Sequence, residues 1–437
     1  MLENFVNPPE LLEIAKNGIT GEAAKPASIL VLGAGIAGLV AALELRKAGH
    51  KVTVIEAQQR VGGRVLTLRS PFSEGVYAEA GAMRIPAQHR LVMDYIERYG
   101  LKLRPFKSHN DKAWAFFHRQ RRPLGEAMLD PNQYDAHLAE HERGKSFEDL
   151  WAETLGPVRE AIHAGGEPAW QDLQQRLQGC SLRDFLADLG WSDGAIEVYG
   201  LYAGFETLLH ASAIEFFREF LAELRQATYT IDGGMDQLPN ALAQDLGSSV
   251  LYGRVVTALD QDDDRVIVYS RGVAGQEIFE ADYAICTLPL SVLRHIEILQ
   301  PFSHHKQRAI RNIHSEAAAK IFFEFRERFW ETQDGIYGGA SVTDLAIRNI
   351  YYPEQGRDSG RGVLLASYSH GQDAHRWGAL PEHERLTQAL ENVAEIHPVA
   401  NELVECGTSV IWSQDEYAGG AYAFFQPHQE RELHEHI

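Results

Sequence analysis

The chain has 437 residues, of which 45% are hydrophobic and 10% aromatic, and its formal net charge is −20 at pH 7. This length predicts two or three domains, and the acidic balance argues against nucleic acid as a partner, because phosphate would be repelled. We find no basic stretch followed by an apolar run at the start, and no segment long enough to cross a bilayer, so we expect a cytoplasmic protein without a membrane partner. The cysteines are few, odd in number and far apart, which predicts neither a disulfide framework nor a metal site: Cys180, Cys286 and Cys406.

The first predicted unit is a strand, a tight turn, a helix and a second strand. SILVL at 28–32 is a short apolar run, and IAGLVAALELRKAG at 36–49 has apolar residues at helical spacing and ends at a glycine. KVTVIEA at 51–57 is a second apolar run. This order predicts a right-handed βαβ unit at the front of an α/β domain.

The next two regions differ in their periodicity. From about Leu124 to Gln226 helical periods replace alternation, which predicts a mostly helical insertion. Strand patterns return after 229–239: two paired strands around an acidic turn within 248–272, and a buried strand at 281–289. Three later runs predict strands of a second sheet: 317–325, 347–353 and 362–368.

The turn of the βαβ unit predicts a dinucleotide site. GAGIAG places Gly33, Gly35 and Gly38 in the spacing that allows a tight turn, a close approach of a pyrophosphate and close packing of helix on strand. The phosphates would lie at the helix N-terminus, where free N–H groups favour anions. Glu56 closes the second strand, where a carboxylate can accept hydrogen bonds from ribose hydroxyls.

A second glycine motif follows in EAQQRVGGRV, with Gly62, Gly63 and Arg64. A surface turn is the alternative interpretation, but the pattern over 29–65 as a whole resembles the FAD-dependent amine oxidase superfamily. In that family the loop lies along the pyrophosphate and its arginine helps to neutralise it. The resemblance implies FAD as the cofactor.

Further segments are similar to L-amino acid oxidases, in the same order along nearly the whole chain: 81–106, 233–246, 319–325, 329–353 and 412–422. The implied fold class is α/β, a Rossmann-type FAD-binding domain interleaved with a mixed-sheet substrate-binding domain and a helical insertion. We expect the FAD-binding domain at 27–66 and 237–310 and the helical domain at 125–236. The substrate-binding domain would take 1–26, 67–124 and 311–437.

Arg84, in EAGAMRIP, is the candidate that separates amino acid from amine substrates. An amino acid carries a carboxylate, and arginine offers a planar fork matched to that group. An amine oxidase should lack an arginine here, because an unpaired buried guanidinium is costly and would repel the ammonium. The alternatives are an internal pair with Glu79, or an exposed arginine.

The resemblance implies two further catalytic residues. Tyr352 in IYYP is the expected second carboxylate ligand, with Tyr351 as its competitor, since neighbouring strand residues face opposite ways. Lys320 matches a family lysine beside flavin N5, where a cation would assist reoxidation by O₂. Its alternative is a lysine whose stem packs on the sheet while its head reaches solvent.

The expected FAD contacts come from the glycine motifs, from the segment around Arg84 and from two later strands. They are Gly33, Gly35, Ala37, Gly38, Glu56, Ala57, Gly63, Arg64, Gly81, Ala82, Met83, Arg84, Val255 and Trp412. Val255 and Trp412 fit plain core positions nearly as well. Gly419 and Gly420 would lie near the flavin, and Ser212, Phe216 and Phe217 could line the substrate entrance.

Two features remain without a role. No general base is evident, and His210 cannot be matched to one. The tail carries His428, His434 and His436, which we interpret as a solvated acidic segment rather than a metal site.

The sequence departs from the family at its end. Relatives continue with a segment that covers the pyrophosphate and flavin, and no match to it precedes Ile437. We therefore expect proteolytic processing, a truncated chain, or a second chain that carries this segment, and weak FAD binding by these residues alone.

The predicted function is oxidative deamination of an L-amino acid with O₂, which yields a 2-oxo acid, ammonia and H₂O₂. The hydride would pass from Cα to flavin N5. The alternatives are an amine or polyamine oxidase, an amino acid 2-monooxygenase, and an FAD-binding fragment that is inactive without a partner chain. A homo-oligomer is compatible with the sequence, and the preferred side chain is not readable.

Overall fold

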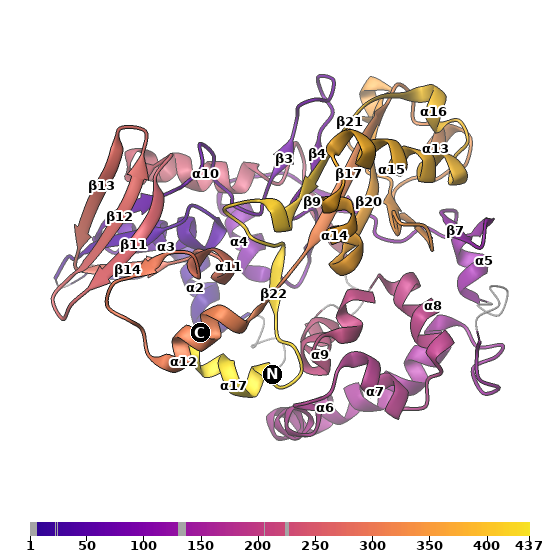
Figure 1. Ribbon diagram of the computed structural model, residues 1–437, viewed down its shortest axis with the longest axis horizontal. Coiled ribbons are helices and arrows are strands. Elements are labelled where there is room, and N and C mark those ends of the chain that lie inside the picture. Colours follow the sequence, from indigo (N-terminus) through magenta and orange to yellow (C-terminus); the bar gives the residue numbers. More distant parts are fainter. Residues whose placement is uncertain (1–6, 22, 24, 130–136, 205, 223–226) are drawn as a thin grey trace.

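The computed structural model describes residues 7–21, 23, 25–129, 137–204, 206–222 and 227–437. Two sheet-containing parts lie at opposite ends of an elongated molecule, and the helices α6 to α9 lie beneath the second (Figure 1). The chain passes between the two parts more than once, which confirms the interleaved α/β architecture. None of the described helices is long and apolar enough to span a membrane.

The first part contains the predicted βαβ unit. Strands β1 (Ser28–Leu32) and β2 (Lys51–Ile55) pair in parallel and are joined by α3 (Ile36–Lys47). The sheet order is β10-β2-β1-β14, with β10 at Val250–Leu251 and β14 at Tyr283–Cys286. Helix α10 (Gln237–Leu246) packs with α3 on the apolar side of this sheet.

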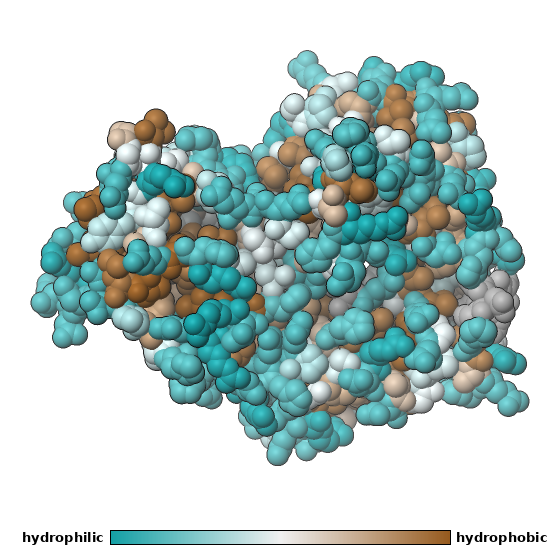
Figure 2. Space-filling view, in the orientation of Figure 1, coloured by the Kyte–Doolittle hydropathy of each residue, from teal (hydrophilic) through white to brown (hydrophobic). Residues whose placement is uncertain are grey.

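The strand predicted as buried, β14, lies at the edge of this sheet and pairs only with β1 among the described residues. Its Tyr283 is 63% exposed, so the prediction of a buried strand is wrong. Figure 2 shows apolar residues gathered at the surface where β11, β14 and α11 (Leu290–Leu293) lie in Figure 1. An apolar run at the edge of a parallel sheet is buried on fewer sides than a central strand.

A second, antiparallel sheet joins this part. Its order is β13-β12-β11-β15, and it includes the two predicted strands around the acidic turn, β11 and β12. The bounds are Val255–Gln261 for β11, Val266–Gly272 for β12, Gly275–Ala281 for β13 and Glu297–Ile298 for β15.

The other end of the molecule is built on a seven-stranded mixed sheet, with order β21-β17-β20-β19-β18-β7-β8. It contains the three later strands expected from the sequence, β17 (Ala318–Phe325), β19 (Asn349–Tyr351) and β20 (Gly362–His370). The remaining strands are β7 (Trp114–Phe117), β8 (Gln120–Pro123), β18 (Ala340–Thr343) and β21 (Val404–Ile411).

Each face of this sheet packs into a separate core, because side chains alternate along a strand. One face packs against the helices α14 (Gly371–Ala379), α15 (Glu382–Ile396) and α16 (Ala400–Leu403). The other face packs against the segment that includes Met83. That second face meets the three-stranded sheet β5-β9-β6, with β5 at Ile85–Pro86, β9 at Thr228–Ile231 and β6 at Leu103–Phe106.

The helical insertion is also confirmed. It comprises α5 (Leu124–Leu129), α6 (Phe147–Leu177), α7 (Leu182–Asp188), α8 (Asp193–Ala203) and α9 (Ala213–Ala222). Capping boxes begin α6 at Ser146 and α7 at Ser181, where each serine exchanges hydrogen bonds with an aspartate three residues on. These helices share a core rich in leucine and aromatic residues.

Candidate active site

The turn between β1 and α3 is shaped by its glycines. Gly33 has φ +98°, a conformation that other residues rarely adopt. A Cβ on Gly38 would lie 2.0 Å from the carbonyl oxygen of Gly33, so only glycine permits this helix to approach the turn. A Cβ on Gly35 would meet nothing within 4 Å, and Ala37 in the first turn of the helix is exposed. The space in front of this helix N-terminus can therefore receive a phosphate.

Glu56 stands beside this turn, at the end of β2, and is 8% exposed. Its carboxylate accepts hydrogen bonds from the N–H of Ala34 at 2.7 Å and of Gln58 at 2.8 Å. Burial raises the pKa of Glu56 above its usual value, while the backbone donors oppose this shift. Arg254 N–H donates to the Glu56 carbonyl at 2.8 Å, which places Val255 next to the predicted ribose-binding acid and its neighbour Ala57.

The second glycine motif lies against the first. Gly62 and Gly35 form an isolated parallel bridge, and a Cβ on Gly63 would lie 3.5 Å from the Cα of Gly35. The exposed Arg64 donates from Nη1 to the carbonyl of Ala421 at 2.9 Å. The two motifs thus form one continuous surface.

The segment that carries Arg84 passes directly over this second motif. A Cβ on Gly81 would lie 1.9 Å from the carbonyl oxygen of Arg64, so the backbones can meet this closely only at a glycine. The N–H of Ala82 donates to the same carbonyl at 3.2 Å. Glycine contacts far apart in sequence therefore hold together three loops, around residues 33–38, 62–64 and 81–84.

A cavity of about 290 Å³ adjoins these loops. It is lined by Ile36 from the first turn of α3, by Ala82 and Arg84, and by Met235 and Leu238. Arg84 is exposed, and most of the other walls are apolar. A cation in an apolar cavity next to the glycine turn is suited to hold an anionic group of a small molecule.

Glu79, the internal alternative as partner of Arg84, has other partners. Its two carboxylate oxygens accept hydrogen bonds from the hydroxyl of Thr67 and from the N–H of Met235, each at 2.9 Å. Burial raises the pKa of Glu79 to about 7, and its N–H and hydroxyl donors oppose this shift. The carboxylate is therefore turned toward Thr67 and Met235.

Lys320 lies under the Arg84 segment and is 2% exposed. Its Nζ donates to the carbonyls of Gly81 at 2.7 Å and Glu79 at 3.0 Å. Burial lowers the pKa of Lys320 to about 7, opposed by Glu79 and assisted by Arg84. The head of this lysine is thus buried at the candidate site and does not reach solvent.

Two residues that sequence reasoning missed complete the site, Tyr368 and His370 on β20. Tyr368 lies opposite Lys320 in the sheet register, and the Lys320 Nζ stands 4.6 Å from the centre of the Tyr368 ring. Burial raises the pKa of Tyr368 to about 12, and the charge of Arg84 opposes this shift. The ring of His370 packs against that of Tyr368 at a tilt of 48°, with ring centroids 4.5 Å apart. The only signal in the sequence was that Tyr368 ends the predicted strand at 362–368 and His370 follows two residues later, on the same side of an extended chain.

Tyr352, the predicted second carboxylate ligand, lies on the other face of the sheet. It is 1% exposed, and its hydroxyl is 2.6 Å from Ser341 Oγ and 2.8 Å from His397 Nε2. The prediction for Tyr352 is therefore corrected, because its hydroxyl is enclosed in the core. Tyr351 faces the site side instead, with its ring 6.3 Å from that of Tyr368.

The remaining predicted contacts surround these residues. Trp412 is 3% exposed and donates from Nε1 to the carbonyl of Ala80 at 2.8 Å, so it packs behind the Arg84 segment. Gly419 and Gly420 form the turn before β22 (Tyr422–Phe424), where a Cβ on Gly420 would lie 2.1 Å from Ser315 Oγ.

The helical residues suggested for the substrate entrance are packed inside the helical core. Phe216 and Phe217 are 5% and 1% exposed and contact Trp151 and Phe185, respectively, edge to face. Ser212 is 1% exposed, so this expectation was wrong for all three. His210 is exposed on a short 3₁₀ helix, and within the described ranges no cluster of metal-ligating side chains occurs, at the histidine tail or elsewhere.

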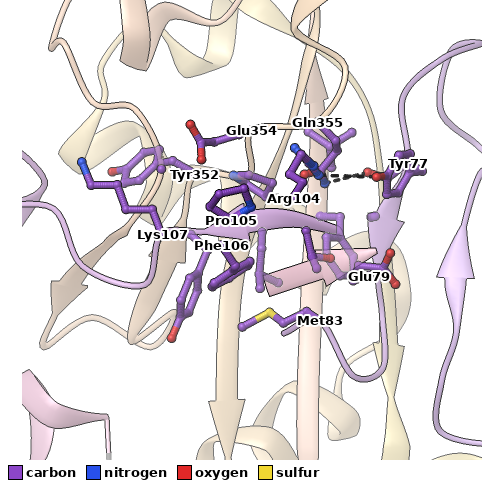
Figure 3. A pocket seen from close by; sticks show the side chains of 18 residues that line it. Tyr77, Glu79, Met83, Arg104, Pro105, Phe106, Lys107, Tyr352, Glu354 and Gln355 are labelled. Carbon is purple, nitrogen blue, oxygen red and sulfur yellow. Dashed lines mark hydrogen bonds between the residues drawn. The ribbon is translucent and has the colours of Figure 1, made fainter. Parts of the chain in front are cut away.

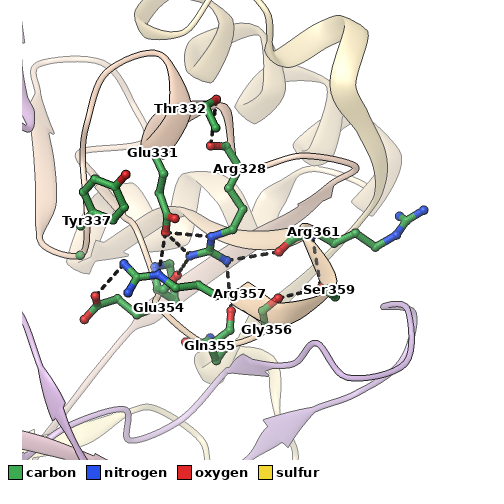
Figure 4. Close-up of polar contacts among 12 residues, drawn as sticks. Arg328, Glu331, Thr332, Tyr337, Glu354, Gln355, Gly356, Arg357, Ser359 and Arg361 are labelled. Carbon is green, nitrogen blue, oxygen red and sulfur yellow. Dashed lines mark hydrogen bonds and ion pairs between the residues drawn. The ribbon is translucent and has the colours of Figure 1, made fainter.

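A second cavity lies between β6 and the seven-stranded sheet (Figure 3). Met83 lines it, whereas the neighbours Ala82 and Arg84 line the first cavity, so this segment separates the two. Its rim includes Glu354 and Gln355, in a loop held by the buried Arg328 (Figure 4). Arg328 donates to the carbonyls of Pro353, Gln355 and Arg361 and pairs with Glu331.

Comparisons with known proteins agree with this geometry. Residues 36–436 match the model of the family "Flavin containing amine oxidoreductase". The chain belongs to this family. Its cofactor is FAD, and the glycine turn, Glu56 and the Arg64 loop offer the phosphate and ribose contacts that FAD requires.

Curated relatives of this flavoprotein carry amino acid oxidase names. It is 37% identical to "Putative L-amino-acid oxidase YobN" of Bacillus subtilis (strain 168), over 99% of this chain and 92% of that protein. It is 36% identical to the L-amino-acid oxidase of Echis ocellatus, over 96% of this chain and 83% of the relative.

Solved structures share the fold of the flavoprotein at lower identity. A putrescine oxidase A394C mutant has a TM-score of 0.73 at 22% identity, covering 94% of this chain and 90% of that one. Cyclohexylamine oxidase from Brevibacterium oxydans IH-35A has a TM-score of 0.74 at 19% identity, covering 94% and 91%. At these identities the likeness concerns the fold alone.

Proposed function

We propose that this flavoprotein oxidises an L-amino acid, with O₂ and water, to a 2-oxo acid, ammonia and H₂O₂. The observation that carries the proposal is Arg84 at the wall of a mostly apolar cavity next to the glycine turn. A substrate carboxylate is the group that a guanidinium in this position binds best, through two parallel N–H···O bonds. An amine substrate would bring a second cation to the same wall.

In this proposal Tyr368 is the second carboxylate ligand. Its ring lies against Lys320 and within the electrostatic reach of Arg84. The raised pKa of Tyr368 keeps its phenol protonated, so the hydroxyl can donate a hydrogen bond to a carboxylate. Arg84 and Tyr368 together would hold the amino acid in one orientation, which is how binding energy lowers the barrier to reaction at Cα.

Bound FAD supplies the acceptor for the hydride that leaves Cα. Lys320, whose Nζ is held beneath the Arg84 segment by two carbonyls, would offer a donor group to the negative charge that develops when O₂ is reduced. The apolar walls limit the access of water to the reacting atoms.

The named relatives favour amino acids over amines as substrates. The proteins at 36% and 37% identity carry L-amino-acid oxidase names, whereas those named for putrescine and cyclohexylamine share 19% to 22%. A pocket that distinguishes carboxylates from amines depends on a few side chains, so the more similar proteins are the better guide.

The test is a peroxide assay of the FAD-loaded protein with the twenty L-amino acids and with their decarboxylated amines. We expect peroxide from at least one amino acid and none above background from its amine. Activity with the amines alone would overturn the proposal. Product analysis separates the monooxygenase alternative, which would release an amide and CO₂ in place of a 2-oxo acid and ammonia.

A further inference from the structure

We propose that His370 is a positioning residue that holds the Tyr368 ring and links it, through Tyr422, to the neighbouring residue Ala421, whose carbonyl is contacted by Arg64. The inference rests on the proposed function, because it takes Tyr368 as a ligand of the substrate carboxylate. It assigns a role to His370, whose ring packs tilted against that of Tyr368 with the ring centres 4.5 Å apart.

The Tyr368 ring is enclosed on several sides. The centre of the His370 ring lies 4.5 Å from it, and the Lys320 Nζ lies 4.6 Å from it. The ring of Tyr351 adds a third contact at 6.3 Å. A phenol enclosed in this way has few rotamers, so the direction of its hydroxyl is set by its neighbours.

His370 is itself held from the opposite side. Its Nδ1 lies 3.4 Å from the hydroxyl of Tyr422, where either atom can donate a hydrogen bond, and the two rings are 5.9 Å apart. Tyr422 begins β22, which pairs with β16 (His314–Glu316). The contact therefore joins β20 to a different sheet.

The residue directly before this strand, Ala421, contacts the loop that carries Arg64. The carbonyl of Ala421 accepts the hydrogen bond from Arg64, and its N–H donates to the carbonyl of Glu316 at 2.8 Å. A continuous path of contacts thus leads from Arg64 through Tyr422 and His370 to Tyr368. A displacement of Arg64 or of Tyr368 would therefore change the packing at the other end of this path.

His370 is kept neutral chiefly by its burial. Burial lowers the pKa of His370 to about 4, Glu316 opposes this shift, and Lys320 and Arg84 assist it. A neutral imidazole retains one ring nitrogen as an acceptor, so it can pair with the Tyr422 hydroxyl without adding a third cation to the carboxylate site.

The experiment titrates the FAD-loaded protein with benzoate, a carboxylate without an amine, and follows the flavin absorbance. Four variants are compared: His370→Leu, His370→Asn, Tyr422→Phe and the double variant with leucine and phenylalanine. His370→Leu should weaken the binding of benzoate about tenfold and Tyr422→Phe about threefold, since each variant loses a contact that orients Tyr368. His370→Asn keeps an acceptor near the position of Nδ1 and should stay within about twofold of the parent.

Two further results are expected from a positioning role. The double variant should be no weaker than His370→Leu alone, because both changes break the same path. The KM for the amino acid should rise with the benzoate Kd, while kcat changes less. His375→Leu, an exposed histidine on α14, is the matched control and should leave both constants unchanged.

Contradicting outcomes are distinct for the two proposals. If Arg84→Ala abolishes benzoate binding but His370→Leu and Tyr422→Phe stay within twofold of the parent, the inference fails and the proposed function stands. If the parent binds no benzoate, the proposed function fails and the inference with it. If His370→Leu does not fold, the test rests on Tyr422→Phe and His370→Asn. The same benzoate Kd in these two variants would overturn the link through Tyr422.

Discussion

The two faces of the seven-stranded sheet each carry a tyrosine beside a histidine, but in opposite settings. On the core face, Tyr352 binds Ser341 and His397, and His397 Nδ1 pairs with Asp334 at 3.0 Å. On the site face, Tyr368 and His370 lie beside two cations, one of which lines a cavity.

The difference separates stability from binding. On the core face, the hydroxyl of Tyr352 and the side chains of Ser341 and His397 satisfy their hydrogen bonds among themselves, and such a network stabilises the fold. The site face instead places the guanidinium of Arg84 at the wall of a mostly apolar cavity, where it can bind an anionic group of a ligand. Residue types that look alike in the sequence therefore have different roles on the two faces.

The largest expected effect is on the site face. Arg84→Ala should lower kcat/KM for the amino acid by about 10²–10⁴, because two charge-assisted bonds are worth about 1.5–3 kcal/mol each. Arg84→Lys should have a kcat/KM little better than that of Arg84→Ala, since one ammonium cannot reproduce the two parallel hydrogen bonds of the guanidinium.

The measurement is a steady-state peroxide assay with a thermal unfolding control. The melting temperature should not change, because Arg84 is exposed. Arg311→Ala, an exposed arginine on α12 (His304–Asn312), serves as the matched control. An unchanged KM for Arg84→Ala would contradict the assignment of Arg84 as a ligand of the substrate carboxylate.

The next effect concerns the buried cation. Lys320→Met keeps the length of the side chain but removes its charge, so the reduced protein should react with O₂ about 10²-fold more slowly. Stability should change little, because relief from burying an ammonium offsets the loss of its hydrogen bonds to the carbonyls of Glu79 and Gly81. Stopped-flow mixing of anaerobically reduced protein with O₂ measures this rate, and an unaltered rate would make Lys320 a structural residue only.

A matched pair of hydroxyl deletions tests the comparison most directly. Tyr368→Phe should raise KM about tenfold with little loss of stability, since it removes a donor to the carboxylate. Tyr352→Phe should leave KM unchanged but lower the free energy of unfolding by about 1–3 kcal/mol, because Ser341 and His397 lose a buried partner. Urea unfolding and steady-state kinetics on both variants give the answer, and a reversed pattern would restore Tyr352 as the ligand.

The smallest effect is in the pH dependence of stability. Burial lowers the pKa of both His370 and His397, so the folded protein binds fewer protons than the unfolded chain once the pH falls below about 6.5. Stability should therefore decline as the pH falls from about 6.5 toward 4. This decline should be shallower in His370→Asn, which lacks one of the two histidines. The measurement is the melting temperature of parent and variant from pH 7 to 4.5, and the same pH dependence in both would contradict the lowered pKa of His370.

Much of the cofactor half was predictable from local sequence. The turn needs glycine at Gly33 and Gly38 because of a positive φ and a backbone contact, and such constraints appear as a fixed spacing. Helical periods likewise marked the insertion between the sheets. Arg84 and Lys320 were recognised by resemblance, and the structure brings both to one site with Tyr368.

The sequence could not predict which tyrosine accompanies Arg84 at the candidate site. Alternation indicated that Tyr351 and Tyr352 face opposite ways, which the structure confirms, but it cannot say which face of a sheet meets the cofactor. That depends on which core each face joins. Tyr368 and His370 carry no motif of their own and acquire a role only because β20 lies beside β17.

From the sequence by itself, spacing within a short segment determined the glycine turn, because a positive φ and a backbone contact there require glycine. The family resemblance implied the cofactor class and, together with the fit of a guanidinium to a carboxylate, indicated Arg84 as the candidate ligand. Only the tertiary structure decided which tyrosine and which histidine accompany Arg84. Those residues meet through register and packing between strands far apart in the chain, and a single sequence does not record which strands become neighbours.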